Sequence, residues 1–259
     1  MTATVRSIQI LKAVARDYEA AGYPVDFLDG WETHGRPYAV LNPRGGVAHH
    51  TATGPNWNPS HVDFLLRDGR RDLPGPLSQV GLDRDATLVV VAAGTANHAG
   101  SGGWRGLKGN GSVFGIEAYN SGLGEPWPQV QLDGYILLAA LFCKHSGFGP
   151  EMWSMHREWS VDGKIDPTGI DGPWFRAQVE AKLHSLNTPT PEVTEVSPYA
   201  FRYVSGNLDW LFDPQFQIHA AIGSDPQLKF LDALGVKEKG RVDITVHDLL
   251  SGISSNWKR

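Results

Sequence analysis

The amino-acid sequence predicts an α/β domain followed by a small helical C-terminal module. Segments with helical spacing of apolar residues alternate with strand-length apolar runs over residues 1–186, a pattern typical of α/β proteins. A stretch rich in proline and threonine at residues 187–198 then indicates an extended linker. The sequence therefore predicts a body that ends at residue 186 and a separate module at residues 199–259.

The first half of the body contains one predicted helix and two predicted strand regions. Residues 6–21 carry apolar residues at helical spacing. Residues 37–51 are predicted as a strand region that ends in two adjacent histidines. Residues 86–93 form a continuous apolar run, which indicates a strand buried on both faces. Helix and strand thus already alternate before the middle of the chain.

The second half of the body adds a strand and two helices. Residues 112–119 are predicted as a strand, and residues 129–145 and 172–186 as helices with apolar stripes. In the tail, Asp-Pro pairs at residues 213 and 225 resemble helix starts, because Asp caps a helix and Pro suits its first turn. The tail is therefore expected to contain two short helices.

Composition excludes several classes of protein. The 259 residues are 41% hydrophobic and 20% charged, which is enough apolar content for a folded core. The longest apolar run, near residues 135–143, is far shorter than the roughly 20 residues of a membrane helix. The net charge of −5 disfavours a general nucleic-acid binder. The single cysteine, Cys143, excludes an intramolecular disulfide and a multi-cysteine metal site.

The N-terminus lacks a basic stretch followed by an apolar one, so no signal peptide is expected and synthesis in a cytoplasm is predicted.

Three polar clusters are candidates for chemistry. His49 and His50 end a predicted strand, where they point to opposite faces, so one of them could bind a metal or both could be structural. His156 precedes Lys164 and Asp166, which point the same way in an extended chain; the alternative is a polar surface loop.

The third cluster is a single acidic residue in an apolar strand. Glu117 alternates with core positions of the predicted strand 112–119. A buried carboxylate needs a partner or a functional reason. An ion pair with Arg105 or Arg157 is one explanation, and catalysis is the other.

Together these residues form a coherent chemical set. Two imidazoles and a carboxylate are typical of catalytic zinc sites, in which the fourth position is left for water. A separate glutamate can accept the proton of that water, and a lysine can stabilise an oxyanion. The set suits amide or ester hydrolysis, although two histidines and a carboxylate can also hold ferrous iron.

At these residues the sequence resembles the zinc-dependent N-acetylmuramoyl-L-alanine amidases of the amidase-2 or peptidoglycan-recognition-protein family. The resemblance covers roughly residues 37–186, and segment 78–104 is similar to endolysins of phages that infect actinobacteria. It implies a central mixed β-sheet flanked by helices. It also implies that residues 1–36 are an N-terminal helical extension of a catalytic domain at residues 37–186.

The resemblance assigns roles to individual residues. It implies Zn²⁺ as the cofactor, with His49, His156 and Asp166 as its ligands and His50 as a neighbour. The family run Lys-x-Asp-Pro-Gly matches residues 164–169 with one extra residue, Thr168, before the glycine.

The catalytic and substrate-binding roles follow from the same comparison. A Gly-Ile-Glu segment implies that Glu117 is the general base, and Lys164 is the lysine on the oxyanion side. Asn97 and His98 match a segment beside the substrate groove, and Trp57 and Trp104 are candidates for lining it.

The implied function is hydrolysis of the amide between N-acetylmuramic acid and L-alanine in bacterial peptidoglycan. The implied biological role is that of a phage endolysin, which is made in the host cytoplasm and acts on the cell wall after release. The expected partner is peptidoglycan, without nucleic-acid binding or membrane insertion. The alternatives are a non-catalytic peptidoglycan-binding module and a muropeptide-recycling amidase.

The tail could bind the cell wall, because its aromatic residues could stack on sugars. It could equally pack on the body or mediate oligomerisation.

Overall fold

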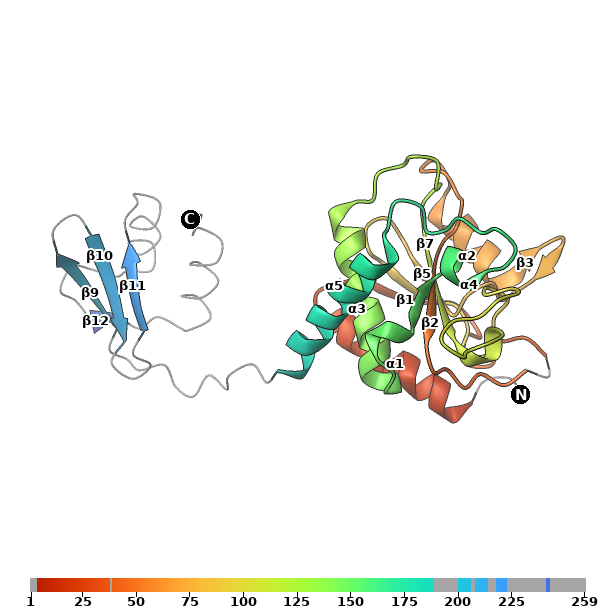
Figure 1. Cartoon of the computed structure of the whole chain (residues 1–259), viewed down its shortest axis with the longest axis horizontal. Coiled ribbons are helices and arrows are strands. Elements are labelled where there is room, and N and C mark those ends of the chain that lie inside the picture. The colour runs from red at the N-terminus through yellow and green to blue at the C-terminus, as the bar shows by residue number, and fades with distance from the viewer. Residues whose placement is uncertain are drawn as a thin grey trace. The chain divides into compact units, whose positions relative to one another are not determined.

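The computed structural model describes residues 4–37 and 39–188, together with the backbone of four strands in the C-terminal part (residues 200–205, 208–213, 218–222 and 241–242). The chain divides into two compact units, Met1–Thr188 and Pro189–Arg259 (Figure 1).

The first unit is built on a six-stranded mixed sheet. Its strand order is β1-β6-β5-β7-β2-β8, and every neighbouring pair is parallel except β5 with β6. The strands are β1 (Val25–Phe27), β2 (Gly46–His50), β5 (Val80–Leu82), β6 (Leu88–Val90), β7 (Phe114–Ala118) and β8 (Trp153–Met155). This confirms the predicted mixed α/β architecture.

Three long helices cover one face of the sheet and a shorter helix covers the other (Figure 1). The first group is α1 (Val5–Ala20), α3 (Gln129–Ser146) and α5 (Gly172–Asn187); the helix on the other face is α2 (Pro59–Asp68). A short helix, α4 (His156–Trp159), follows β8, and a small hairpin, β3 (Gly69–Arg70) and β4 (Leu73–Pro74), follows α2. Two 3-10 turns, η1 (Asn110–Ser112) and η2 (Pro150–Met152), complete the unit.

The buried side chains follow the alternation of the strands. Ala48 and Ile116 belong to the main core with the three long helices, whereas Val89, Val91 and Tyr119 pack against α2. Residues on opposite sides of the pleat therefore enter different cores. The central strands are covered on both sides, which explains their nearly continuous apolar sequences.

The N-terminal helix α1 is anchored to the rest of the unit. Thr4 caps it by accepting the Ser7 N–H at 3.0 Å, a bond that satisfies one free donor of the first turn. The buried hydroxyl of Tyr18 donates to the Ala86 carbonyl at 2.9 Å. Near the other end, Asp17 accepts hydrogen bonds from Lys144 and His145 of α3.

The tail prediction is corrected by the structure. The described residues there form an antiparallel sheet with the order β11-β10-β9-β12. The strands are β9 (Ala200–Ser205), β10 (Leu208–Asp213), β11 (Ile218–Ile222) and β12 (Arg241–Val242). Asp213, one of the two predicted helix starts, is the last residue of β10, and residues 214–217 lie outside the described residues. Sequence 200–213 has aromatic residues at alternate positions, 201 and 203 before Gly206-Asn207 and 210 and 212 after it, a pattern that favours a hairpin and outweighs the Asp-Pro signal. The predicted helix start at Asp225 and the linker from residue 189 onward lie outside the described residues.

Candidate active site

The three candidate ligands come from three separate segments that meet at one end of the sheet. His49 lies near the C-terminal end of β2, where it is paired with Glu117 of the adjacent strand β7. His156 follows β8 directly and begins α4. Asp166 lies in the loop between α4 and α5. Because β2 and β8 are parallel neighbours, the two histidines leave the sheet at the same edge.

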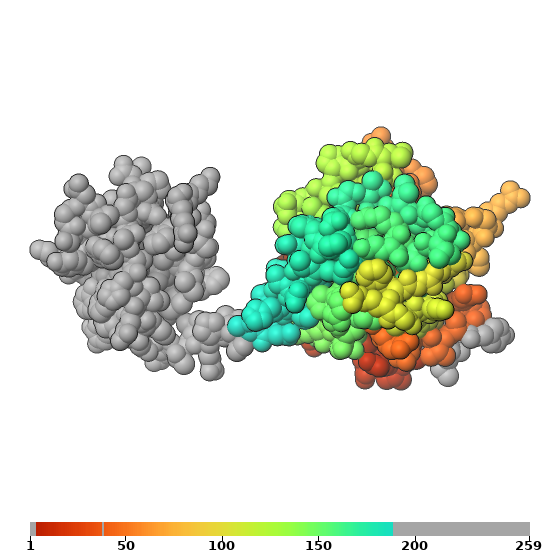
Figure 2. Space-filling model, in the orientation of Figure 1, coloured from red at the N-terminus to blue at the C-terminus, as the bar shows by residue number. Residues whose placement is uncertain are grey.

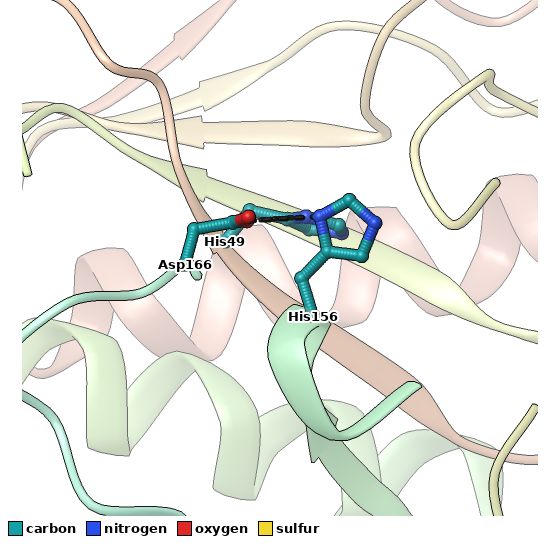
Figure 3. A group of neighbouring side chains, drawn as sticks. All are labelled: His49, His156 and Asp166. Atoms are coloured by element: carbon teal, nitrogen blue, oxygen red, sulfur yellow. Dashed lines mark hydrogen bonds and ion pairs between the residues drawn. The ribbon is translucent and has the colours of Figure 1, made fainter. Parts of the chain in front are cut away.

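The side chains of these residues converge on one point (Figure 3). The Oδ2 atom of Asp166 lies 3.1 Å from His49 Nδ1 and 3.0 Å from His156 Nδ1. One ligand atom from each residue lies within 4.8 Å of the others. All three side chains are buried, so the cluster is held in place by the protein.

The donor set fits a zinc ion. Zinc bonds of about 2.0–2.2 Å in a tetrahedral set separate neighbouring ligand atoms by about 3.3–3.6 Å, a few tenths of an ångström more than the two distances observed here. Burial lowers the pKa of His49 to about 4, so the ring is neutral at neutral pH. Burial would raise the pKa of Asp166, but the hydrogen bonds from His156 and His49 outweigh it and lower the pKa below its ordinary value. Neutral imidazole and ionised carboxylate are the forms that bind a metal.

The loop that carries Asp166 is held by several hydrogen bonds. The Arg157 backbone N–H donates to the Asp166 carbonyl at 3.0 Å, and its guanidinium donates to the carbonyls of Pro167 and Ile170. Thr168 is also bound on both sides: its N–H donates to His50 Nδ1 at 3.1 Å, and its carbonyl accepts the indole N–H of Trp127 at 2.9 Å. The extra residue Thr168 is therefore accommodated in an ordered loop.

Arg157 is the positioning residue that sequence reasoning does not identify. The sequence suggests it only as an ion-pair partner of Glu117. Its place directly after His156 is the available signal, but the carbonyls that it binds become its neighbours only in the folded chain.

Glu117 lies beside the cluster, and none of the described residues forms a hydrogen bond with its side chain. Its Oε2 atom is buried and has no hydrogen-bond partner among the described residues, and no ion pair to Glu117 occurs within residues 4–37 and 39–188. Burial, together with the charge of Asp166, raises the pKa of Glu117 well above its ordinary value, and the nearby charges of Lys164 and Arg70 act in the opposite direction. A carboxylate in such surroundings is suited to accept a proton near neutral pH.

A groove of about 540 Å³ is lined by two residues of the cluster, His156 and Asp166. Its polar residues include His98, Glu117, His156 and Asp166, and it also borders His50 and Asn97. Two cationic side chains, Arg70 and Lys164, line it as well. The apolar lining consists mainly of Leu65, Leu66, Leu73, Leu77, Leu123 and Ile165.

The loop near residue 102 lies against the segment that follows α4 (yellow against green in Figure 2). The Gly103 N–H donates to the Trp159 carbonyl at 3.0 Å, and the Val161 N–H donates to the Ser101 carbonyl at 3.2 Å. These bonds connect the loop that follows His98 to the segment that follows His156.

The four predicted substrate contacts lie in different places. Asn97 lines the groove, and its side chain donates to the Pro74 carbonyl at 2.9 Å. This bond connects the hairpin of β3 and β4 to the segment that carries Asn97. His98 also lines the groove, but its ring is buried and its Nδ1 lies 3.0 Å from His49 Nε2.

The two tryptophans lie outside the lining of this groove. Trp57 is 52% exposed just before α2. Trp104 donates to the Glu151 carbonyl at 2.9 Å, and the guanidinium of Arg176 stands over its ring. Their roles in substrate binding stay predictions.

Solved structures of amidases and endolysins are similar to this chain. N-acetylmuramoyl-L-alanine amidase LysC from Clostridium intestinale is 18% identical, with 60% of this chain and 96% of that chain covered and a TM-score of 0.47. A mutant endolysin from Bacillus subtilis is 16% identical, with 61% and 99% covered and a TM-score of 0.47. The amidase AmiD from E. coli is 20% identical, with 57% and 61% covered and a TM-score of 0.43. No curated protein matches the chain.

A family model described as N-acetylmuramoyl-L-alanine amidase matches residues 39–169, a range that contains the whole candidate cluster and Glu117. Because this match spans just over half of the 259 residues, the chain belongs to the N-acetylmuramoyl-L-alanine amidase family.

Proposed function

We propose that this protein hydrolyses the amide bond between N-acetylmuramic acid and L-alanine in bacterial peptidoglycan, with zinc held by His49, His156 and Asp166. The observation that carries the proposal is the convergence of these three side chains beside a groove that His156, Asp166 and Glu117 line. All four residues lie within the range that matches the amidase family.

The bound ion would supply Lewis-acid chemistry, by lowering the pKa of a water molecule toward about 7 and by polarising a carbonyl oxygen. Glu117 accepts the proton of the attacking water and later donates a proton to the amine nitrogen of L-alanine as the C–N bond breaks. Lys164 lines the groove and stabilises the negative charge that develops on the carbonyl oxygen. Asn97 and His98 border the space that the substrate occupies.

We also propose that the protein acts as a phage endolysin on the cell wall of an actinobacterial host. The resemblance of segment 78–104 to such endolysins supports this role. A second unit, Pro189–Arg259, suits an insoluble polymer, because a wall-binding module would raise the local concentration of substrate. We propose that this unit binds the wall.

Among the described residues, no helix has both the length and the apolar character needed to cross a membrane.

The decisive experiment compares wild type with Asp166→Ala and with the control Asp162→Ala. Asp162 is exposed in the same loop region and lies outside the cluster. Zinc content is measured by mass spectrometry, wall lysis by turbidity, and bond specificity by the appearance of new N-terminal alanine. Wild type and control are expected to contain about one zinc per chain and to release alanine termini.

Asp166→Ala is expected to lose the zinc and to lower the rate by more than roughly 100-fold, because changing a group that merely supports a ligand already costs about 10–100-fold. Zinc retention with unchanged lysis would remove Asp166 from the site. A wild-type protein that binds peptidoglycan but neither holds zinc nor releases alanine would instead be a binding module.

A further inference from the structure

His98 is held in a fixed position next to Nε2 of the candidate metal ligand His49. Its ring is only 6% exposed and lies on Gly115, where a Cβ atom in place of the glycine hydrogen would come within 2.8 Å of the imidazole. The backbone N–H groups of His98 and Ala99 both donate to Asn110 Oδ1, at 3.1 and 2.7 Å. This packing sets His98 Nδ1 at 3.0 Å from His49 Nε2.

The two ring nitrogens of His49 have different neighbours. Nδ1 faces the carboxylate of Asp166, whereas Nε2 faces His98 Nδ1. A neutral imidazole carries a single N–H, so the nitrogen that binds a metal leaves the proton to the other nitrogen.

Metal binding decides which nitrogen of His49 carries the proton. A metal at the three-residue cluster takes the lone pair of His49 Nδ1, so the proton of His49 must lie on Nε2. His49 Nε2 then donates to His98 Nδ1, and His98 carries its own proton on Nε2, a buried atom that has no hydrogen-bond partner among the described residues.

We propose that His98 is the positioning residue for the zinc ligand His49, because its Nδ1 accepts the hydrogen bond that holds the proton of His49 on Nε2 and leaves His49 Nδ1 free for the metal. This inference rests on the metal site of the proposed function. His98 can accept this bond because one tautomer of a neutral imidazole carries its proton on Nε2 and leaves Nδ1 as an acceptor. A side chain without an acceptor would leave His49 Nε2–H unsatisfied in a buried site.

Two substitutions at residue 98 separate the hydrogen bond from the packing. His98→Asn keeps a polar atom at the position of Nδ1, and its amide can donate or accept by rotation. His98→Leu fills a similar volume but has neither function. His145→Asn is the control, because His145 is a partly buried histidine that binds Asp17 away from the groove.

The zinc affinity of the full-length variants is measured by competition with a chelator. His98→Leu is expected to bind zinc about 10–100-fold more weakly than wild type, which is the usual cost of removing a hydrogen-bond partner from a metal-binding histidine. His98→Asn is expected to recover most of that loss, and His145→Asn to bind as wild type does. Equal zinc affinity in wild type and His98→Leu would overturn the proposal.

Nitrogen-15 spectra of the imidazoles in the zinc-loaded wild-type protein test the hydrogen bond directly. The protons of His49 and His98 are both expected on Nε2. A proton on Nδ1 of His98 in the zinc-loaded protein would overturn the proposal even if His98→Leu failed to fold. Zinc binding by wild type is measured first, so its absence would count against the proposed function and not against the pairing of the two rings alone.

Discussion

At the scale of single residues, the properties of Glu117 are set by its place in the sheet. The residue is paired with His49 on the adjacent parallel strand, which brings its carboxyl group beside the cluster. Its neighbours on β7, Ile116 and Ala118, enter the apolar core on the opposite face. The alternation of the strand thus places one acidic side chain at the groove and anchors it with two apolar ones.

The raised pKa of Glu117 predicts the pH dependence of activity. Glu117 acts as a base only when ionised, so kcat/KM should fall as the pH drops through its raised pKa. Glu117→Gln should lower kcat by roughly 100- to 10,000-fold while zinc content stays at the wild-type level. The pH profile of kcat/KM and metal analysis check both points. An acid limb that persists unchanged in Glu117→Gln would assign it to another group.

At the scale of elements, α1 is attached to α3 by a charged cluster as well as by apolar packing. Asp17 accepts hydrogen bonds from Lys144 at 3.1 Å and from His145 at 2.9 Å, and Arg16 binds it from the same helix. Burial would raise the pKa of Asp17, but the hydrogen bonds from these three side chains outweigh it and lower the pKa to about 2.

Replacing Asp17 should therefore weaken the fold in a pH-dependent way. A lowered pKa means that the folded state favours the ionised carboxylate, so its contribution is complete above about pH 4 and is lost as the pH falls toward 2. Asp17→Asn should lower the free energy of unfolding by about 1 kcal/mol at pH 7, after allowance for solvent screening. Denaturant unfolding at several pH values measures this.

The exposed residue Glu19 on the same helix offers a control, since Glu19→Gln should leave the free energy of unfolding nearly unchanged. If Asp17→Asn lowers the free energy of unfolding as much at pH 2 as at pH 7, the loss is caused by packing and not by charge.

At the scale of the whole molecule, the candidate active site belongs entirely to the first unit. Its ligands, Glu117 and the groove residues all lie within Met1–Thr188. The second unit has its own antiparallel sheet in the described residues. Chemistry and attachment to the wall are thus expected to be separable properties of the chain.

Truncation after Thr188 tests this separation. The shortened protein should keep its zinc and should hydrolyse a soluble muropeptide about as fast as the full chain. On insoluble cell walls its rate should fall by roughly 10–100-fold, because the second binding contact and its effective concentration are lost. Comparison of the two substrates at equal enzyme concentration checks this. If the truncated and the full-length protein have equal rates on each of the two substrates, residues 189–259 have another purpose.

The sequence by itself determined the class of fold and the chemical inventory. Helical spacing and apolar runs are local, so α3, α5 and the central strands β6 and β7 can be predicted from short windows. The candidate residues at positions 49, 117, 156 and 166 can also be identified from short segments, because the motifs that contain them are short. In the tail, the described residues 200–205 and 208–213 form strands where a helical module is predicted, because aromatic residues at alternate positions favour strands there.

Only the tertiary structure decided which of these groups meet. His49 and Asp166 are 117 positions apart, and His49 and His98 are 49 apart, yet each pair lies within hydrogen-bonding distance. These contacts depend on the order of the strands in the sheet, and that order cannot be predicted from any short segment of the sequence. Arg157 binds the loop of Asp166, and Gly115 makes room for His98, for the same reason: hydrogen bonding and packing act between neighbours in space, whereas periodicity acts along the chain.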